Sequence, residues 1–198
     1  MKISINQPAF LPWLNYFKRI AEVDIFVLLD DVQFEKNSFI NRTKINNQKN
    51  NESLWLTIPL KKNKFHSEKN LIKNIQISTD PLWKKKQLKT ISQNFSNQKN
   101  YINKIYDYND TDLLKFLIYQ LKIILEILKI DTKIILSSDL NIEEKKTLKI
   151  FEICKKLKAD EYVSGPLGKN YLDESVFTNK IKLSYFNNDE IYQNAVEW

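Results

Sequence analysis

Residues 3–31 read ISINQPAFLPWLNYFKRIAEVDIFVLLDD, and this stretch decides the fold class. The short apolar run at residues 3–6 predicts a strand, and the apolar residues within 12–23 recur at the spacing of one helix face. Residues 24–30 are almost continuously apolar, which is typical of a strand covered on both faces of a parallel sheet. Strand, helix and strand together predict a right-handed βαβ unit.

The rest of the chain extends this alternation and interrupts it once. Further strands are expected at 54–60, 75–78, 134–137, 162–164 and 182–186, and further helices at 81–95, 101–106, 112–129 and 142–158. We therefore predict an α/β protein with a Rossmann-like fold, in which helices flank a mostly parallel sheet. It is expected to form a single domain over residues 1–198, with a helical insertion at about 80–130.

The loop after the first strand is expected to lie where ligands bind, because open parallel sheets bind ligands at the carboxyl ends of their strands. Two of the five prolines, Pro8 and Pro12, restrict this loop. We predict that Gln7 hydrogen-bonds a substrate, with Pro8 beside it in the same site. The rings of Trp13 and Tyr16 are suited to stacking on a sugar or a base.

Three residues are candidates for catalysis. Asp30 and Asp31 end the second predicted strand, where carboxylates can hold a cation, a ribose or an amine, or act as a general base. The alternative is a turn in which Asp31 caps the next segment. His66 is the only histidine, and it lies in a lysine-rich loop, so it is either a general base or a solvated loop residue.

The only two glycines of the chain fall in one short stretch, Ser164–Lys169, which reads SGPLGK. A glycine turn after a strand can present backbone N–H groups to an anion, with Lys169 as a point charge. We therefore predict a phosphate-binding role for Ser164, Gly165, Gly168 and Lys169. The alternative is a tight structural turn, and the spacing differs from that of a Walker P-loop.

Arginine is as rare as glycine in this chain, with only Arg19 and Arg42 among many lysines. Because this chain uses lysine freely, an arginine that is kept at a position indicates that the planar guanidinium is needed there and not the positive charge alone. We predict that Asn41 and Arg42 clamp a phosphate or carboxylate of the substrate.

Composition narrows the classes of protein that remain. One histidine and one cysteine cannot build a zinc site of the usual ligand count or a disulfide within the chain, so Cys154 is expected to be a buried thiol. No other cofactor is indicated. No apolar run is long enough to span a membrane and no signal peptide begins the chain, so we expect a cytoplasmic protein.

The net charge of +7 has two interpretations. Clustered lysines can bind a polyanion such as a nucleic acid. Alternatively, the lysines reflect the codon usage of an A+T-rich genome, and no nucleic-acid-binding motif accompanies them. The sequence does not specify an oligomeric state.

Several motifs occur in an order that resembles one known family. Residues 7–17 (QPAFLPWLNYF) and 24–34 (DIFVLLDDVQF) are followed by further matching motifs. These are Asn41 with Arg42, residues 56–59 (LTIP), 162–165 (YVSG), Tyr171 with Leu172, and Tyr192 with Gln193. In this order they are similar to the WbqC-like protein family. Two departures stand out: Asn15 replaces a usual glycine, and a further family segment is expected after Trp198 but is missing.

The resemblance implies a pathway, because WbqC-like proteins are typically encoded in bacterial gene clusters for O-antigen, lipopolysaccharide and other surface polysaccharides. We expect an enzyme that acts on a nucleotide-linked amino sugar, as a transferase of an acyl or aminoacyl group to the sugar nitrogen. The alternative is a non-catalytic accessory protein of polysaccharide assembly, or a basic protein that binds nucleic acid.

Overall fold

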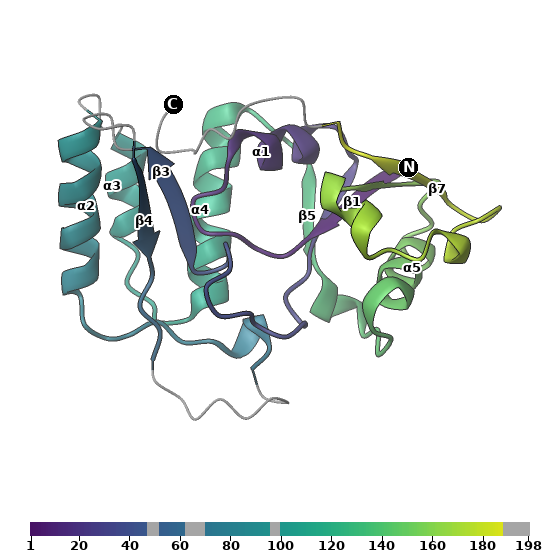
Figure 1. Cartoon of the computed structure of the whole chain (residues 1–198), viewed down its shortest axis with the longest axis horizontal. Coiled ribbons are helices and arrows are strands. Elements are labelled where there is room, and N and C mark those ends of the chain that lie inside the picture. Colours follow the sequence, from purple (N-terminus) through teal and green to yellow (C-terminus); the bar gives the residue numbers. More distant parts are fainter. Residues whose placement is uncertain (47–51, 62–69, 96–99, 188–198) are drawn as a thin grey trace. The chain divides into compact units, whose positions relative to one another are not determined.

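A computed structural model describes residues 1–46, 52–61, 70–95 and 100–187 (Figure 1). Contacts divide the chain into two compact units. The sheet unit comprises the described residues of Met1–Gln7, Asn15–Asp31 and Ile130–Ile191, and the helical unit those of Pro8–Leu14 and Val32–Lys129. A single domain over residues 1–198 stays a prediction.

The sheet unit contains a five-stranded sheet in the order β5-β2-β1-β6-β7, and every pairing in it is parallel. The strands are β1 (Lys2–Asn6), β2 (Ile25–Leu28), β5 (Lys133–Leu136), β6 (Glu161–Ser164) and β7 (Lys182–Tyr185). The helices are α1 (Leu14–Ala21) and α5 (Lys146–Lys156), with short 3-10 helices η2 (Ser137–Leu140), η3 (Pro166–Asn170) and η4 (Glu174–Val176). The predicted α/β, Rossmann-like class is confirmed.

Alternation along the strands explains how the sheet is covered. Successive side chains point to opposite faces, so Val27 of β2 packs in one core cluster with Phe151 and Cys154 of α5. Its neighbour Phe26 contacts Tyr16 of α1, with ring centroids 5.4 Å apart. All four residues of β2 are buried, as the continuous apolar run predicted.

Parallel strands bring the residues that follow them to one edge of the sheet, here called the carboxyl edge. Gln7 follows β1, Asp30 and Asp31 follow β2, Ser137 follows β5 and Gly165 follows β6. The sheet order places β2, β1 and β6 next to one another. Candidate residues from distant parts of the sequence therefore meet at this edge.

The helical unit contains three helices, which confirms the predicted helical insertion. They are α2 (Leu82–Asn94), α3 (Asn100–Tyr106) and α4 (Leu113–Leu128), and the unit also holds η1 (Ile72–Asn74) and an antiparallel pair, β3 (Arg42–Asn46) and β4 (Ser53–Thr57). The amphipathic helix α4 begins at a cap in which the Asp112 carboxylate accepts from the Lys115 N–H. No helix in the described ranges is long and apolar enough to cross a membrane.

The structure differs from the predicted elements in three places. Strand β3 was not predicted, because its residues are polar except for Ile45, and it pairs with β4 outside the parallel sheet. Within residues 75–78, Gln76 and Ile77 form isolated bridges and no strand is present. The helix expected from residue 142 begins at Lys146, because Ser137–Leu140 form a 3-10 turn that ends at Asn141 in the left-handed conformation.

Candidate functional site

The Asp30 carboxylate is buried at the carboxyl edge, with 1% of the residue exposed. Its Oδ1 accepts hydrogen bonds from the Ser137 hydroxyl (3.1 Å) and the Ser138 N–H (3.0 Å), and its Oδ2 accepts from the Ser138 hydroxyl (2.7 Å). These bonds tie the end of β2 to the start of η2 after β5. Both carboxylate oxygens are therefore engaged within the sheet unit.

The Asp31 carboxylate lies beside Asp30 and forms a buried ion pair. Its Oδ2 is 2.9 Å from the Nζ of Lys149 on α5, and its Oδ1 accepts from the Ser137 hydroxyl at 2.5 Å. Lys149 also donates to the Ile142 carbonyl at 2.8 Å. The ion pair anchors α5 to the carboxyl edge, and catalytic roles for Asp30 and Asp31 stay predictions.

The first loop starts at Gln7, which is partly exposed after β1, and continues into the buried Pro8. The Gln7 carbonyl accepts a hydrogen bond from the Tyr16 hydroxyl at 3.1 Å. Only 2% of Tyr16 is exposed, and its ring packs against Phe17 and Phe26. A ring buried in this way offers no open face for the stacking role predicted for Tyr16.

The glycine stretch after β6 forms the 3-10 helix η3, in which the Gly168 N–H donates to the Gly165 carbonyl at 2.9 Å. Neither glycine has a positive φ. Close packing explains why both positions are glycine. A Cβ on Gly168 would lie 2.0 Å from the Ser164 hydroxyl oxygen, and one on Gly165 would lie 2.3 Å from a terminal nitrogen of Arg19. The exposed Lys169 places its ammonium 5.2 Å from the ring centre of Tyr185.

Arg19, which reaches Gly165 from α1, is 7% exposed, and no specific site was predicted for it. Its Nε is buried without a hydrogen-bond partner. Desolvation lowers the pKa of this guanidinium, and the interactions that oppose the shift come from the phenol groups of Tyr162, Tyr16 and Tyr171 rather than from a carboxylate. The carboxyl edge thus holds a buried cation whose charge is not balanced by an acidic side chain in the described ranges.

In the helical unit, an aromatic cluster gathers two of the residues that were predicted to bind substrate. The Trp13 and Phe39 ring centroids are 5.2 Å apart, and those of Phe39 and Trp55 are 5.7 Å apart. The Arg42 guanidinium lies over the Trp55 ring, 4.1 Å from its centre. Trp55 is 45% exposed and Phe39 37% exposed, so this cluster presents aromatic surface to solvent.

Asn41 lies next to Arg42 but is 7% exposed. Its side-chain amide donates to the Ile58 carbonyl at 3.1 Å, while its Oδ1 is buried without a partner. Asn41 is therefore a buried residue that joins the start of β3 to the residue after β4. Of the remaining predicted residues, His66, Tyr192 and Gln193 lie outside the described residues.

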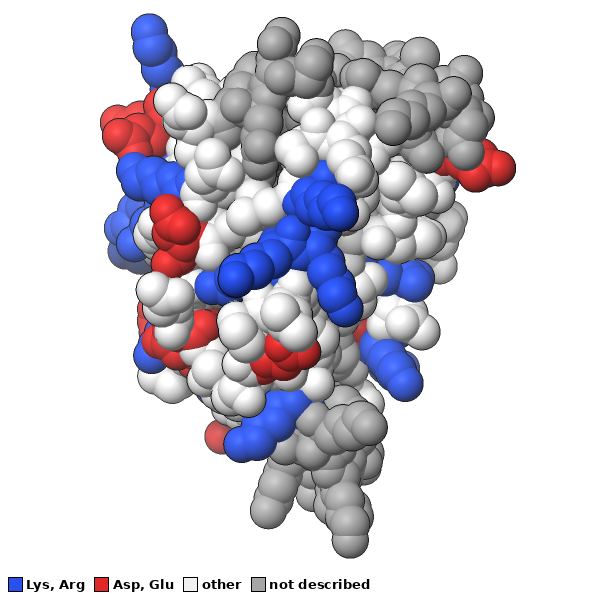
Figure 2. Space-filling model, turned by 90° about the vertical axis from the view of Figure 1, so that its left-hand side faces the viewer, with Lys and Arg blue, Asp and Glu red and all other residues white. Residues whose placement is uncertain are grey.

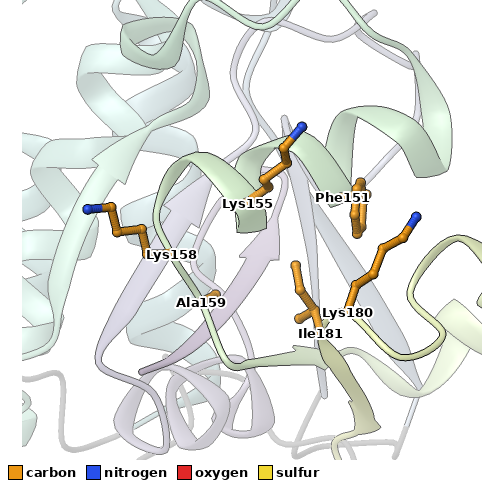
Figure 3. A pocket seen from close by; sticks show the side chains of 6 residues that line it. All are labelled: Phe151, Lys155, Lys158, Ala159, Lys180 and Ile181. Atoms are coloured by element: carbon orange, nitrogen blue, oxygen red, sulfur yellow. The ribbon is translucent and has the colours of Figure 1, made fainter.

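A hollow of about 390 Å³ lies at the opposite edge of the sheet (Figure 3). It is lined by Phe151, Lys155, Lys158, Ala159, Lys180 and Ile181. Ala159 precedes β6 and Ile181 precedes β7, which puts the hollow at the amino ends of the strands. Lys158 points away from Lys155 and Lys180 (Figure 3), so the three cations do not converge on one ligand.

In the described ranges, no group of three or more His, Cys, Asp or Glu side chains lies close enough together to hold a metal ion. Cys154 is a buried free thiol on α5. The candidate residues described above are carboxylate, hydrogen-bonding, cationic and aromatic groups.

The fold and these residues define an α/β protein with a Rossmann-like parallel sheet and polar groups gathered at its carboxyl edge. The chain belongs to the WbqC-like protein family, which matches residues 7–197. It is 31% identical over 198 residues to "Uncharacterized protein Rv1507c" of Mycobacterium tuberculosis (strain ATCC 25618 / H37Rv), a match that covers 95% of this chain and 83% of that protein. No solved structure matches the chain.

The family match extends to residue 197, so it gives no support to the expectation of a missing family segment after Trp198. The resemblance read from the ordered motifs is confirmed. Four residues of these sites were not predicted: Phe39, Trp55, Ser137 and Lys149. They carry no local signal in the sequence, because their roles depend on partners far away in the chain. Arg19 did carry a signal, since it is one of only two arginines.

Proposed function

We propose that the protein acts in the biosynthesis of a bacterial surface polysaccharide such as O-antigen or lipopolysaccharide, as a transferase that acts on a nucleotide-linked amino sugar. Family membership supports the pathway. The observation that carries the substrate class is the cluster of Trp13, Phe39, Trp55 and Arg42 in the helical unit.

This cluster suits a ligand that has both a ring and a phosphate. Aromatic faces bind sugars and bases through stacking and exclusion of water. The Arg42 guanidinium can keep one flat face on Trp55 while its edge donates to phosphate oxygens, because the planar fork combines stacking with bidentate hydrogen bonding. Its Nε is buried without a partner, which favours an acceptor supplied by a ligand.

The proposed reaction forms an amide on the sugar. The amine nitrogen attacks the carbonyl carbon of an activated acyl or aminoacyl donor, and the new C–N bond forms as the bond to the donor's leaving group breaks. The proton released from the amine passes to a general base. Asp30, Asp31 and His66 stay the predicted candidates for that base.

The binding step is tested by titrating nucleotide-activated amino sugars into the wild-type protein and into Trp55→Ala and Arg42→Met variants by calorimetry. Stacking on one aromatic ring contributes about 1–3 kcal/mol, so we expect Trp55→Ala to lower the affinity roughly fivefold to a hundredfold. We expect Arg42→Met to lower it as well, because the guanidinium no longer donates to the phosphate. Leu82→Ala is the matched control, because Leu82 is an exposed apolar residue of the same unit. Equal affinities in all four proteins would remove this cluster from substrate binding.

The transfer step is tested by mass spectrometry of the sugar after incubation with cell extract as the source of donor. We expect the mass of an added acyl or aminoacyl group with the wild-type protein. Tight binding without any gain of mass would favour the non-catalytic accessory role instead.

Nucleic-acid binding is the second candidate, and the lysines of α2 favour it. This helix carries Lys84, Lys85, Lys86 and Lys89. Figure 2 faces the side on which α2 lies and shows basic side chains gathered near the centre of the view. Binding through these lysines would weaken steeply with salt, by roughly 0.7–0.9 log units per phosphate contact for each log unit of salt. Weak, salt-sensitive binding to RNA beside saturable binding of a nucleotide sugar would favour the transferase.

A further inference from the structure

Among the described residues, the buried guanidinium of Arg19 has no acidic partner that balances its charge. Only 7% of the residue is exposed, its Nε is fully buried and lacks a hydrogen bond, and the described residues form no ion pair with it. The guanidinium also lies over the ring of Phe26, whose centroid is 5.8 Å from Cζ. The polar groups around it are the neutral phenols of Tyr16, Tyr162 and Tyr171.

Such an arrangement is costly, because a charged group loses its hydration on burial and needs a counter-charge or hydrogen bonds in return. A cation–π contact at this distance offsets a small part of that cost. Arginine cannot escape the cost by losing its proton, since it stays charged even where burial lowers its pKa, as it does here. In the part of the chain that the structure describes, the site therefore lacks the anion that would offset this cost.

The position of the guanidinium indicates where the anion would enter. Its terminal nitrogen lies against Gly165, the first residue after β6, and a Cβ at that position would come within 2.3 Å of it. One of the two arginines of the chain thus packs on one of its two glycines. This contact is at the carboxyl edge, close to Tyr171, which is 64% exposed.

We propose that Arg19, seated against Gly165 beneath the turn of η3, is the binding group for an oxyanion, the phosphate or carboxylate of a ligand that enters over the carboxyl edge. The guanidinium fork presents two parallel N–H donors to the two coplanar oxygens that both groups share. Because position 165 carries no side chain, the guanidinium has room to lie directly against the backbone there. This site stands independently of the aromatic cluster of the helical unit and of the proposed sugar substrate.

Thermal unfolding in the presence of simple anions tests the proposal. Inorganic phosphate, pyrophosphate and acetate are titrated at constant ionic strength into the wild-type protein, Arg19→Met, and the control Lys18→Met, which removes the same charge from the neighbouring position of α1. The melting temperature of the wild type and of the control should rise by about 5–10 °C at roughly 100 times the dissociation constant. The rise should be absent in Arg19→Met.

Gly165→Ala keeps the positive charge but places a methyl group where the guanidinium lies, and it keeps the test decisive if Arg19→Met fails to fold. It should abolish the anion-dependent rise in the same way. A rise with phosphate and pyrophosphate but not acetate identifies the phosphate part of a ligand, and the reverse identifies a carboxylate. The absence of a rise in the wild type with every anion, or an equal rise in Arg19→Met, overturns the proposal.

Discussion

At the scale of single residues, Asp31 and Lys149 make a buried pair whose partners stand 118 positions apart. Their side chains are 13% and 8% exposed. We expect Asp31→Asn to lower the free energy of unfolding by about 3 kcal/mol, because it leaves the buried ammonium of Lys149 without its counter-charge. Urea denaturation followed by circular dichroism measures this.

The double variant Asp31→Asn/Lys149→Met is the control for that pairing. Removing both charges should cost less than the sum of the two single substitutions, since neither group is then left unpaired. If the losses of unfolding free energy in the two single variants add up to the loss in the double variant, the two side chains do not stabilise each other. A loss of catalysis in Asp31→Asn therefore has to be judged beside its stability.

Cys154 is a second residue whose behaviour follows from burial. Desolvation raises the pKa of its thiol to about 12 from an ordinary value of 9.0. We expect iodoacetamide at pH 8 to label the unfolded chain readily and the folded protein hardly at all, because the thiolate is the reactive form. Mass spectrometry of samples labelled with and without guanidinium chloride measures the difference, and equal labelling would contradict the burial of Cys154.

The raised pKa of Cys154 also makes the free energy of unfolding depend on pH. The folded thiol keeps its proton to a higher pH than the unfolded thiol, so its contribution to the free energy of unfolding is complete below about pH 9 and is lost as the pH rises towards 12. Cys154→Ala should remove this part of the alkaline dependence.

At the scale of elements, the proline-rich loop owes its shape to more than its prolines. The buried Gln120 side chain of α4 donates to the Ala9 carbonyl (2.6 Å) and accepts from the Leu11 N–H (3.0 Å), where Leu11 has a φ of 40°. The Thr43 hydroxyl of β3 donates to the Leu11 carbonyl at 3.0 Å. Helix and hairpin together hold the loop in a conformation that its own residues do not dictate.

We expect Gln120→Leu to destabilise the protein by about 2–4 kcal/mol. It leaves a buried N–H and a buried carbonyl unpaired, and each such group costs about 1–3 kcal/mol. Chemical denaturation checks the magnitude. Leu121→Met on the same helix, a buried change of similar volume, should cost less than about 1.5 kcal/mol, and an equal loss in both variants would argue against the hydrogen bonds.

The elements also differ in how well local sequence specified them. Helix α4 and strand β2 were predictable because their apolar residues follow one period over their whole length. Strand β3 was not, since RTKIN carries a weak strand pattern and is held by its pairing with β4. Tertiary pairing decides such short strands.

At the scale of the whole molecule, the chain is predicted to be one domain although its contacts gather in two units. One domain predicts one cooperative thermal transition, with equal calorimetric and van't Hoff enthalpies. Differential scanning calorimetry measures both. Two transitions, one shifted by Gln120→Leu and the other by Asp31→Asn, would contradict the single domain.

The sequence by itself determined the α/β class, the helical insertion and the family, because these depend on local periodicity and on motifs whose order can be read along the chain. It also marked Arg19 and the two glycines as unusual through their rarity. Only the tertiary structure decided that Arg19 packs on Gly165, that Asp31 pairs with Lys149, and that Trp55 joins Arg42. Each of these contacts joins residues from different elements, and no local spacing encodes which distant partner will satisfy a buried charge or cover an aromatic ring.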